Sequence, residues 1–290
     1  MTGVTGTERG PVLRVLRAVA YAALPAELVL LTLLLGGVRI PGGVWVGAEL
    51  VTAGLLAAEA VVWVRLRRRG LSRREALAEL VPERVLRLIG HELRLMASLG
   101  RWVARRPHGT GGAAGVFPHA RDQAALMYGF AFVCLVETVG MSWLLADWPV
   151  VHAVVLVLDV YTVLFVLGLH AAAVTRPHVL ADGRLRVRQA AHVDVAVPLE
   201  RIAAVRRENR FTHEKADGEL NLAVGSQTSV TLELSGPVDV VGLLGRVRPV
   251  TTVRLHADDP KALYEAVRDA VAVTRARTAP SPGQDPLPTA

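Results

Sequence analysis

Cysteine and recognisable catalytic motifs are what the sequence most clearly lacks. Cys134 is the only cysteine among the 290 residues, so no disulfide can form within the chain. The chain also has no nucleophile elbow, zinc-protease helix, Walker loop or paired-cysteine motif. We therefore expect no metal or cofactor and a protein that is not an enzyme. A membrane enzyme is the third hypothesis, since intramembrane catalysis can rest on a few polar side chains.

Apolar residues, by contrast, are abundant and make up 52% of the sequence. Most of them lie in four runs of about twenty residues, the length that an α-helix needs to cross a bilayer. The runs are Ala18–Val38, Val44–Val64, Ala124–Leu145 and Pro149–Val174. Basic residues precede the first run, as in a signal peptide, but the run is too long for one and a second follows at once. The sequence predicts an α-helical membrane domain of four transmembrane helices.

Arginine predicts the orientation of these helices. The segment between the second and third runs is rich in arginine, whereas the short connections RIPGG and ADW hold only Arg39. Because positively charged loops stay in the cytoplasm, we predict a multi-pass plasma-membrane protein with both termini cytoplasmic. Tryptophans at the predicted span ends agree with this placement, since indole rings favour the interface. These are Trp45, Trp63, Trp143 and Trp148.

The basic middle segment has the pattern of two helices. Ser72 and Glu75 form a capping box, and Pro82 suits the first turn of a second helix. In that helix one stripe is apolar: Val85, Leu88, Ile89, Met96, Leu99 and Val103. A separate stripe is basic and is our candidate membrane-surface patch: Arg84, Arg87, Arg94, Arg101 and Arg105, with His91.

Two interpretations of this helix stay open. It lies in the membrane interface, with its arginines near anionic lipid headgroups, or its apolar stripe packs on the cytoplasmic domain and the arginines only set the topology. Nucleic acid is not an expected partner, because the aromatic platform that would stack bases is missing. The glycine-containing loop that follows, with His108 and His119, predicts a flexible linker without metal ligands.

After Arg176–Pro177 the pattern changes to short alternating strands. HVLA and RLRVR flank Asp182–Gly183, a strong two-residue hairpin signal. Further strands are expected at HVDVAV, after PLERI, at LNLAV, at SVTLEL and at TTVRLHA. A final helix begins after Asp258 or Asp259 with Pro260 in its first turn, and Leu263, Val267 and Val271 face inward.

The run DGRLRVRQ…VPLERIAAVRRE resembles bacterial pleckstrin-homology-like (PH-like) domains, in which a hairpin leads into a P-L-x-x-I corner. The whole chain is similar to uncharacterised bacterial membrane proteins that carry such a domain after their spans. The resemblance implies a cytoplasmic PH-like β-barrel with a capping helix, and a binding or scaffold role. Arg184, Arg186 and Arg188 alternate onto one strand face, which we expect to be solvated or to face the membrane. The hairpin loop is too short to cradle a phosphoinositide headgroup.

Carboxylic acids lie inside the predicted spans without a basic partner. Glu27, Glu137 and Asp159 fall at similar depth on three helices, and Glu59 lies nearer the cytoplasm. They could form a cluster that handles protons or cations, or they could be neutral acids that hydrogen-bond between helices. His152 and His170 lie at opposite ends of the fourth span and cannot share a metal.

The leading hypothesis is a scaffold protein that presents the PH-like domain for binding a protein partner or the lipid surface. A small transporter or channel component that uses the intramembrane acids is the alternative, and a homo-oligomer is compatible with both. The expected domains are the first hairpin (1–64), the basic helices and linker (65–123), the second hairpin (124–174), the PH-like domain (175–277) and a disordered tail (278–290).

Overall fold

The computed structural model describes residues 41–73, 75–76, 81–211 and 216–278. The first predicted span, with Glu27, and residues 279–290 of the predicted tail lie outside the described residues. The chain divides into two compact units. One consists of residues 1–87 and 138–158, and the other of residues 88–137 and 159–290.

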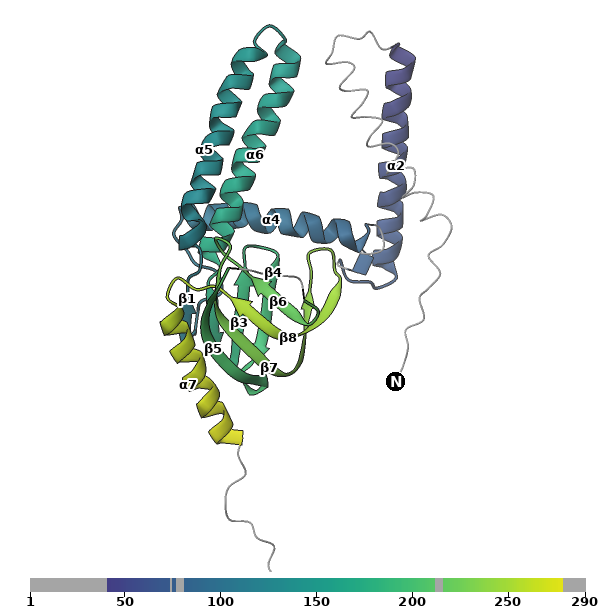
Figure 1. The fold of residues 1–290 in the computed structure, drawn as a ribbon. Coiled ribbons are helices and arrows are strands. Elements are labelled where there is room, and N and C mark those ends of the chain that lie inside the picture. Colours follow the sequence, from purple (N-terminus) through teal and green to yellow (C-terminus); the bar gives the residue numbers. More distant parts are fainter. Residues whose placement is uncertain (1–40, 74, 77–80, 212–215, 279–290) are drawn as a thin grey trace, which may run out of the picture. The chain divides into compact units, whose positions relative to one another are not determined.

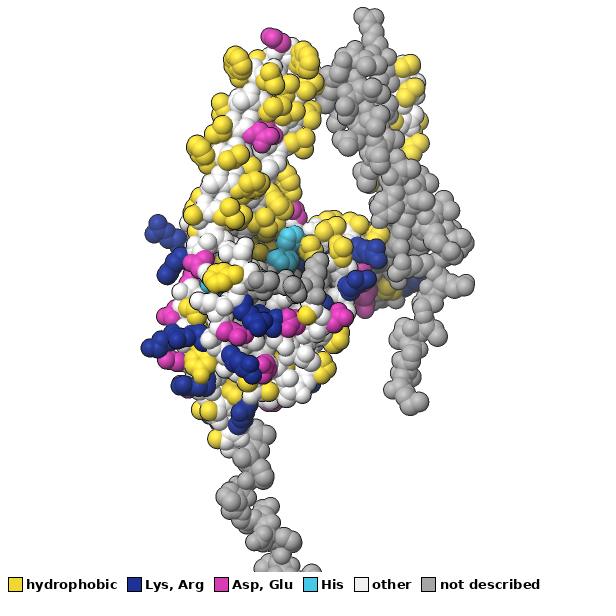
Figure 2. Space-filling view, in the orientation of Figure 1, with side chains coloured by type: hydrophobic (Ala, Val, Ile, Leu, Met, Phe, Trp, Pro, Cys, Tyr) yellow, Lys and Arg dark blue, Asp and Glu magenta, His cyan; other side chains and the backbone are white. Residues whose placement is uncertain are grey.

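Three helices are long and apolar enough to cross a membrane: α2 (Gly42–Arg68), α5 (Arg121–Leu144) and α6 (Pro149–Thr175). They match the second, third and fourth predicted runs to within a few residues. α5 and α6 run antiparallel as a hairpin (Figure 1). The apolar side chains that cover this hairpin are visible in Figure 2.

The helix signals in the middle segment are confirmed. The Ser72 backbone N–H donates to Glu75 Oε2 at 2.7 Å, and the Glu75 N–H donates to Ser72 Oγ at 3.2 Å. This reciprocal pair is the capping box. The pKa of Glu75 lies below its usual value because hydrogen bonds from the Ser72 side chain and backbone favour the carboxylate. Helix α4 (Glu83–Val103) begins directly after Pro82.

The C-terminal region is rich in β-sheet, and each predicted strand is present. The strands are β2 (His178–Ala181), β3 (Arg184–Gln189), β4 (Val193–Pro198), β5 (Ile202–Arg210), β6 (Glu219–Leu222), β7 (Thr228–Val241) and β8 (Val247–Leu255), with a short 3-10 turn, η1 (Leu199–Arg201), before β5. Together with β1 (Gly115–Phe117) they form two four-stranded sheets rather than a closed barrel, in the orders β1-β2-β3-β4 and β5-β7-β8-β6. Only the β6–β8 pair is parallel among the described strand pairs.

The Asp182–Gly183 turn is the predicted hairpin. Ala181 pairs with Arg184 across it, and the two turn residues have φ values of 49° and 68°. Positive φ at both positions is what a two-residue type I′ turn requires, and Asp–Gly adopts it at low cost. The hairpin therefore sets the register of β2 against β3.

One hydrophobic core lies between the two sheets and helix α7 (Pro260–Thr278). The predicted inward residues Leu263, Val267 and Val271 of the final helix are buried. The alternating apolar residues of the predicted strands are buried as well: Leu199, Ile202, Leu220, Leu222, Val224, Val230, Leu232 and Leu234. The α7 N-terminus is capped by Asp259, whose Oδ1 accepts from the Ala262 N–H at 3.0 Å. The alternation of apolar residues therefore predicted the core correctly.

The predicted flexible linker is wrong over residues 115–120. Gly115–Phe117 forms strand β1, which pairs antiparallel with β2, and Phe117 lies in the core. The Asp258 N–H donates to Pro118 O, and the Arg121 N–H donates to Asp258 Oδ1. Both ends of the α5–α6 hairpin are thus fixed to the sheets, and the folded domain includes a strand that precedes α5.

Replacing Phe117 with Ala should destabilise the sheet domain by about 3–5 kcal/mol, because a buried aromatic side chain is lost and a cavity remains. Val116→Ala on the same strand is the matched control, since Val116 is exposed. Thermal unfolding of the full-length protein in detergent would measure the difference. Equal melting temperatures for the two variants would contradict the assignment of β1 to the domain.

Candidate membrane-surface site

Helix α6 continues into the sheet domain almost without a connection. It ends at Thr175, and only Arg176 and Pro177 separate it from β2. Thr175 Oγ1 donates to Ala171 O, and the His108 N–H donates to Thr175 O at 2.7 Å. So short and hydrogen-bonded a joint leaves the sheet domain little freedom relative to the end of α6.

Helix α4 crosses α6 at Gly168 in close contact. A Cβ built on Gly168 would lie 3.5 Å from Leu95 Cβ and 3.6 Å from Met96 Cε. Leu95 and Ala172 are fully buried here, together with Ala191 of the sheet domain. Small residues on α6 allow this approach, as they do wherever helix backbones pack closely.

Two further contacts show which face of α4 lies against α6 and which lies against the sheet domain. Tyr161 Oη, which lies on α6 well before the end of that helix, donates to Glu92 Oε1 at 2.8 Å. On another side of α4, Arg94 Nη1 donates to Ala191 O at 3.1 Å in the β3–β4 turn. α4 therefore lies between the apolar length of α6 and the sheet domain, as Figure 1 shows.

The packed strip of α4 lies beside the predicted apolar stripe rather than along it. It consists of His91, Leu95, Ser98 and Trp102, of which Leu95 and Ser98 are fully buried and the other two half-buried. On the apolar stripe Leu88, Ile89 and Val103 are 45%, 50% and 76% exposed. Half of the stripe is thus exposed, whereas Val85 and Leu99 are half-buried and Met96 packs against α6.

The five arginines of the candidate patch differ in their surroundings. Arg84 and Arg105 are exposed, and Arg101 is half-buried. Arg87 pairs with Glu83 at 2.5 Å. Arg94 is exposed but donates to Gly90 O as well as to Ala191 O. The patch is therefore only partly available to a ligand.

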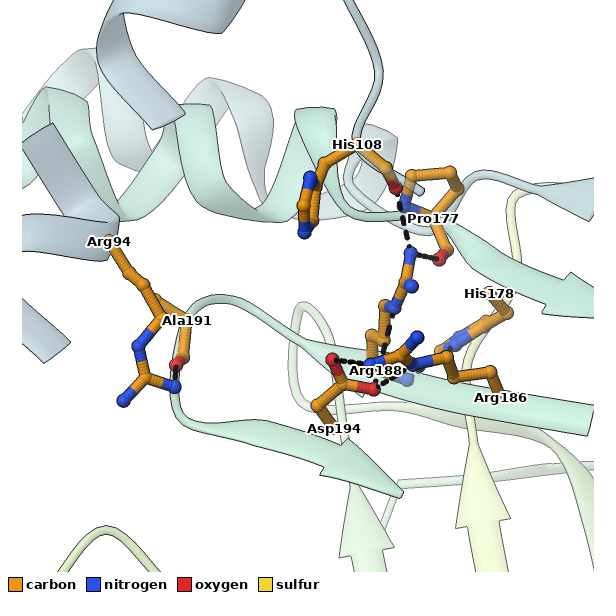
Figure 3. A network of polar contacts seen from close by, with 8 residues as sticks. All are labelled: Arg94, His108, Pro177, His178, Arg186, Arg188, Ala191 and Asp194. Carbon is orange, nitrogen blue, oxygen red and sulfur yellow. Dashed lines mark hydrogen bonds and ion pairs between the residues drawn. The ribbon is translucent and has the colours of Figure 1, made fainter. Parts of the chain in front are cut away.

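Arg188 is the main correction among the predicted residues. Its side chain is 1% exposed, so it does not belong to a solvated or membrane-facing strand face. Arg188 Nη1 donates to His108 O at 2.9 Å, and Nε lies 3.5 Å from Asp194 Oδ1 (Figure 3). The loop at His108 covers Arg188, and a Cβ on Gly109 would lie 2.9 Å from its Nη2.

The other two arginines of that face are exposed, as predicted. Arg186 donates to both carboxylate oxygens of Asp194, Nε to Oδ1 at 2.5 Å and Nη2 to Oδ2 at 2.9 Å. This bidentate bond raises the pKa of Arg186 and occupies its guanidinium. The face therefore offers less free charge than the sequence predicts.

Cations gather where α4, α6 and the sheet domain meet. Arg176 is 5% exposed, and its Nε has no hydrogen-bond partner among the described residues. Burial lowers the pKa of Arg176, as does repulsion by Arg94, Arg101 and Arg188, while Asp194 raises it. Arginines thus outnumber acids among the groups that act on Arg176. The sequence analysis predicted neither Arg176 nor Asp194 as a site residue.

The acids of the predicted intramembrane cluster lie on three described helices and on the first predicted run. Glu137 lies on α5 and is exposed, whereas Asp159 lies on α6 and its buried Oδ2 has no hydrogen-bond partner there. Glu59 lies on α2, and Glu27 falls outside the described residues. Within the described part of the chain, His, Cys, Asp and Glu form no group that could hold a metal ion.

Three histidines meet where the sheet domain receives α5 and α6. His119 stacks on His178 with ring centroids 4.5 Å apart. His178 Nδ1 accepts the Arg188 backbone N–H at 3.0 Å, so His178 Nε2 carries the proton that it donates to His256 O at 2.9 Å. His256 Nε2 lies 3.2 Å from Asp122 Oδ2. His119 is therefore buried within the sheet domain rather than exposed on a flexible linker.

Burial lowers the pKa of all three rings. The pKa of His178 falls to about 4, and that of His119 lies well below its usual value, with repulsion from His178 as the second cause. The pKa of His256 is also lowered by burial, against the opposing effect of Asp122. The neutral rings are thus part of the folded state.

Comparisons of the chain with protein-family models, curated proteins and solved structures found no match.

Acidification from pH 6.5 to pH 4 should destabilise the sheet domain. In this window His178 binds a proton in the unfolded state but not in the folded state. The free energy of unfolding therefore decreases as the pH decreases, by roughly 3 kcal/mol from His178 alone. His119 acts in the same direction. Thermal unfolding of the full-length protein measured across this range gives the slope.

The His119→Phe variant separates this cause from general acid denaturation. Phenylalanine keeps the ring on His178 but removes one buried titrating group whose two nitrogens have no partner in the described structure. We expect a shallower dependence of melting temperature on pH than in the wild type. An unchanged slope would show that the histidines do not control acid stability.

Proposed function

We propose that this chain is an integral membrane protein that binds the cytoplasmic membrane surface and holds its C-terminal domain there for interaction. The observation that carries the proposal is the exposed apolar stripe of α4. Leu88, Ile89 and Val103 of this stripe are exposed in the structure, and exposed apolar side chains on one helix face are stable next to lipid and unfavourable next to water. The interfacial interpretation of α4 is therefore favoured over packing on the domain.

Charge supports the same arrangement. Arginines on α4 and at the α6 exit lie where the apolar helices end, which is the level of the lipid headgroups in a spanning protein. Each arginine near an anionic leaflet contributes roughly 1 kcal/mol to binding. The first predicted span, the cytoplasmic orientation and the plasma membrane belong to this proposal.

The resemblance of the C-terminal domain to PH-like domains is also part of the proposal. Two packed sheets closed by a C-terminal helix are compatible with such a module, although β1 and the parallel β6–β8 pair were not expected from the resemblance. A domain fixed at the membrane by α4 and α6 suits a scaffold role, with a protein partner as the second class of ligand.

Spin labels at three positions of α4 test this placement in liposomes. Cys134 is the only cysteine, so a Cys134→Ser background allows single labels at Ile89→Cys, Val103→Cys and Ala97→Cys. Ile89 and Val103 belong to the apolar stripe, whereas Ala97 is an exposed residue outside the stripe, about 80° around the helix from Ile89 and about 120° from Val103. We expect oxygen to relax the labels at 89 and 103, and a water-soluble nickel complex to relax the label at 97.

Equal access of the nickel complex to all three labels would overturn the interfacial placement. An unlabelled Cys134→Ser protein that unfolds at the wild-type temperature controls for damage by the background substitution. The result does not depend on which lipid or protein the domain binds.

A transporter component is the second candidate because the buried Oδ2 of Asp159, on a candidate span, has no hydrogen-bond partner among the described residues. Placing an unpaired acid inside a membrane span costs free energy, and such acids often mark functional sites. Asp159→Asn and Glu137→Gln should abolish proton or cation flux in proteoliposomes if these acids conduct. Equal flux in wild type and double variant would remove this candidate.

A further inference from the structure

A groove lies where α4 ends beside the end of α6. It has a volume of about 590 Å³ and is lined by Trp102, Val103, Arg105, Arg106, Pro107, Val174 and Thr175. Both walls belong to the same compact unit, and the His108 N–H, directly after the lining residue Pro107, donates to Thr175 O. The groove is therefore formed by fixed backbone segments.

The groove has an apolar part and a basic part. Val103 and Val174 are exposed apolar residues, and the ring of Trp102 is held against His170 at 5.7 Å between centroids. Arg105 and Arg106 lie at the other side and are both exposed. An apolar wall next to two cations complements a molecule with an acyl chain and a negative head.

Arg105 occupies a position where glycine is usual. Its φ is 53°, its N–H donates to Trp102 O at 3.0 Å, and the Arg106 N–H donates to Arg101 O at 2.8 Å. These two bonds form a Schellman motif, whose left-handed residue is commonly glycine because it has no Cβ. Arg105 thus lines the groove even though its positive φ is unfavourable for a residue with a side chain.

The nearby charge adds to the attraction for an anion. Arg101 and the buried Arg176 flank the groove in sequence, and Arg176 interacts with Arg94, Arg101 and Arg188. Asp194 is the single acid among the groups that act on Arg176, and it already binds Arg186. The positive charge of this junction is therefore not balanced by the protein itself.

We propose that this groove binds one anionic phospholipid, with the phosphate on Arg105 and Arg106 and an acyl chain against Trp102, Val103 and Val174. The groove lies at the last residues of a candidate membrane-spanning helix, where phospholipid headgroups are found. The inference rests on the proposed membrane function and makes it specific, because it names a single site rather than a charged surface.

Native mass spectrometry of the full-length protein in mild detergent tests the site. Phosphatidylglycerol and phosphatidylcholine are added in equal amounts, and the lipids retained by each variant are counted. The test variant is Arg105→Gly with Arg106→Gln. Since each arginine near an anionic lipid is equivalent to about fivefold in affinity, we expect retention of phosphatidylglycerol to weaken roughly 30-fold.

The substitution at Arg105 keeps the fold intact by design. Glycine relieves the positive φ, so Arg105→Gly should unfold at or above the wild-type temperature while lipid retention falls. Two matched controls should retain lipid like the wild type. Ser226→Gly relieves another positive φ (63°), and Arg248→Gln removes an exposed arginine of β8.

Three results would overturn the proposal. They are equal retention of phosphatidylglycerol by the double variant, equal retention of phosphatidylcholine by the wild type, and displacement of the lipid by excess inorganic phosphate, which would point to a soluble phosphate ligand. If the α4 spin labels lie in lipid but the double variant still retains phosphatidylglycerol, the groove assignment alone fails and the interfacial helix stands.

Discussion

The close contact between α4 and α6 at Gly168 is the constraint on which the rest of the arrangement depends. Any side chain at position 168 would meet Leu95 and Met96 at van der Waals distance or closer. This contact fixes the rotation of α4 about its axis, because Glu92 must reach Tyr161 while Arg94 reaches Ala191. In this orientation Leu88, Ile89 and Val103 of the apolar stripe are left exposed. A helix held only by electrostatics would be free to turn that stripe toward the sheet domain.

The second constraint is the joint between α6 and β2. Arg188 bonds to His108 and lies near Asp194, and His178 bonds to both the Arg188 backbone and His256. A buried arginine with an acid at 3.5 Å is costly to desolvate, so its role is better understood as fixing one geometry than as adding stability. Together the two constraints hold α4 and the end of α6 against the sheet domain, which suits the proposed surface-binding function.

Local patterns predicted most of the fold. Period-two alternation located seven strands, Asp182–Gly183 the hairpin, Ser72–Glu75 a cap, and three of the apolar runs match helices. The patterns did not predict features that depend on contacts between segments far apart in the sequence. β1 has only three residues, too short for a period, and its partner β2 lies beyond two long helices. Arg188 alternates with Arg184 and Arg186, but the His108 loop covers only Arg188.

The candidate site was predicted in part for the same reason. A helical wheel separates the apolar and basic faces of α4, but it cannot tell that the strip between them, with Leu95 and Ser98, is the one that packs. Arg176 gave no signal, because one arginine after a span is common. The pairing of Arg188 with Asp194 across β3 and β4 could have been found, since the two lie opposite each other in the hairpin register.

The most direct test of the central claim is a cross-link between α4 and α6 in native membranes. In a Cys134→Ser background, Leu95→Cys and Gly168→Cys would place two Cβ atoms about 3.5 Å apart, within the range that a disulfide requires. The account predicts that mild oxidation joins them, so that cleavage at a protease site inserted after Gly111 leaves both fragments together until a reductant is added. Fragments that separate without reductant would show that α4 does not lie on α6 and that the stripe has no fixed direction.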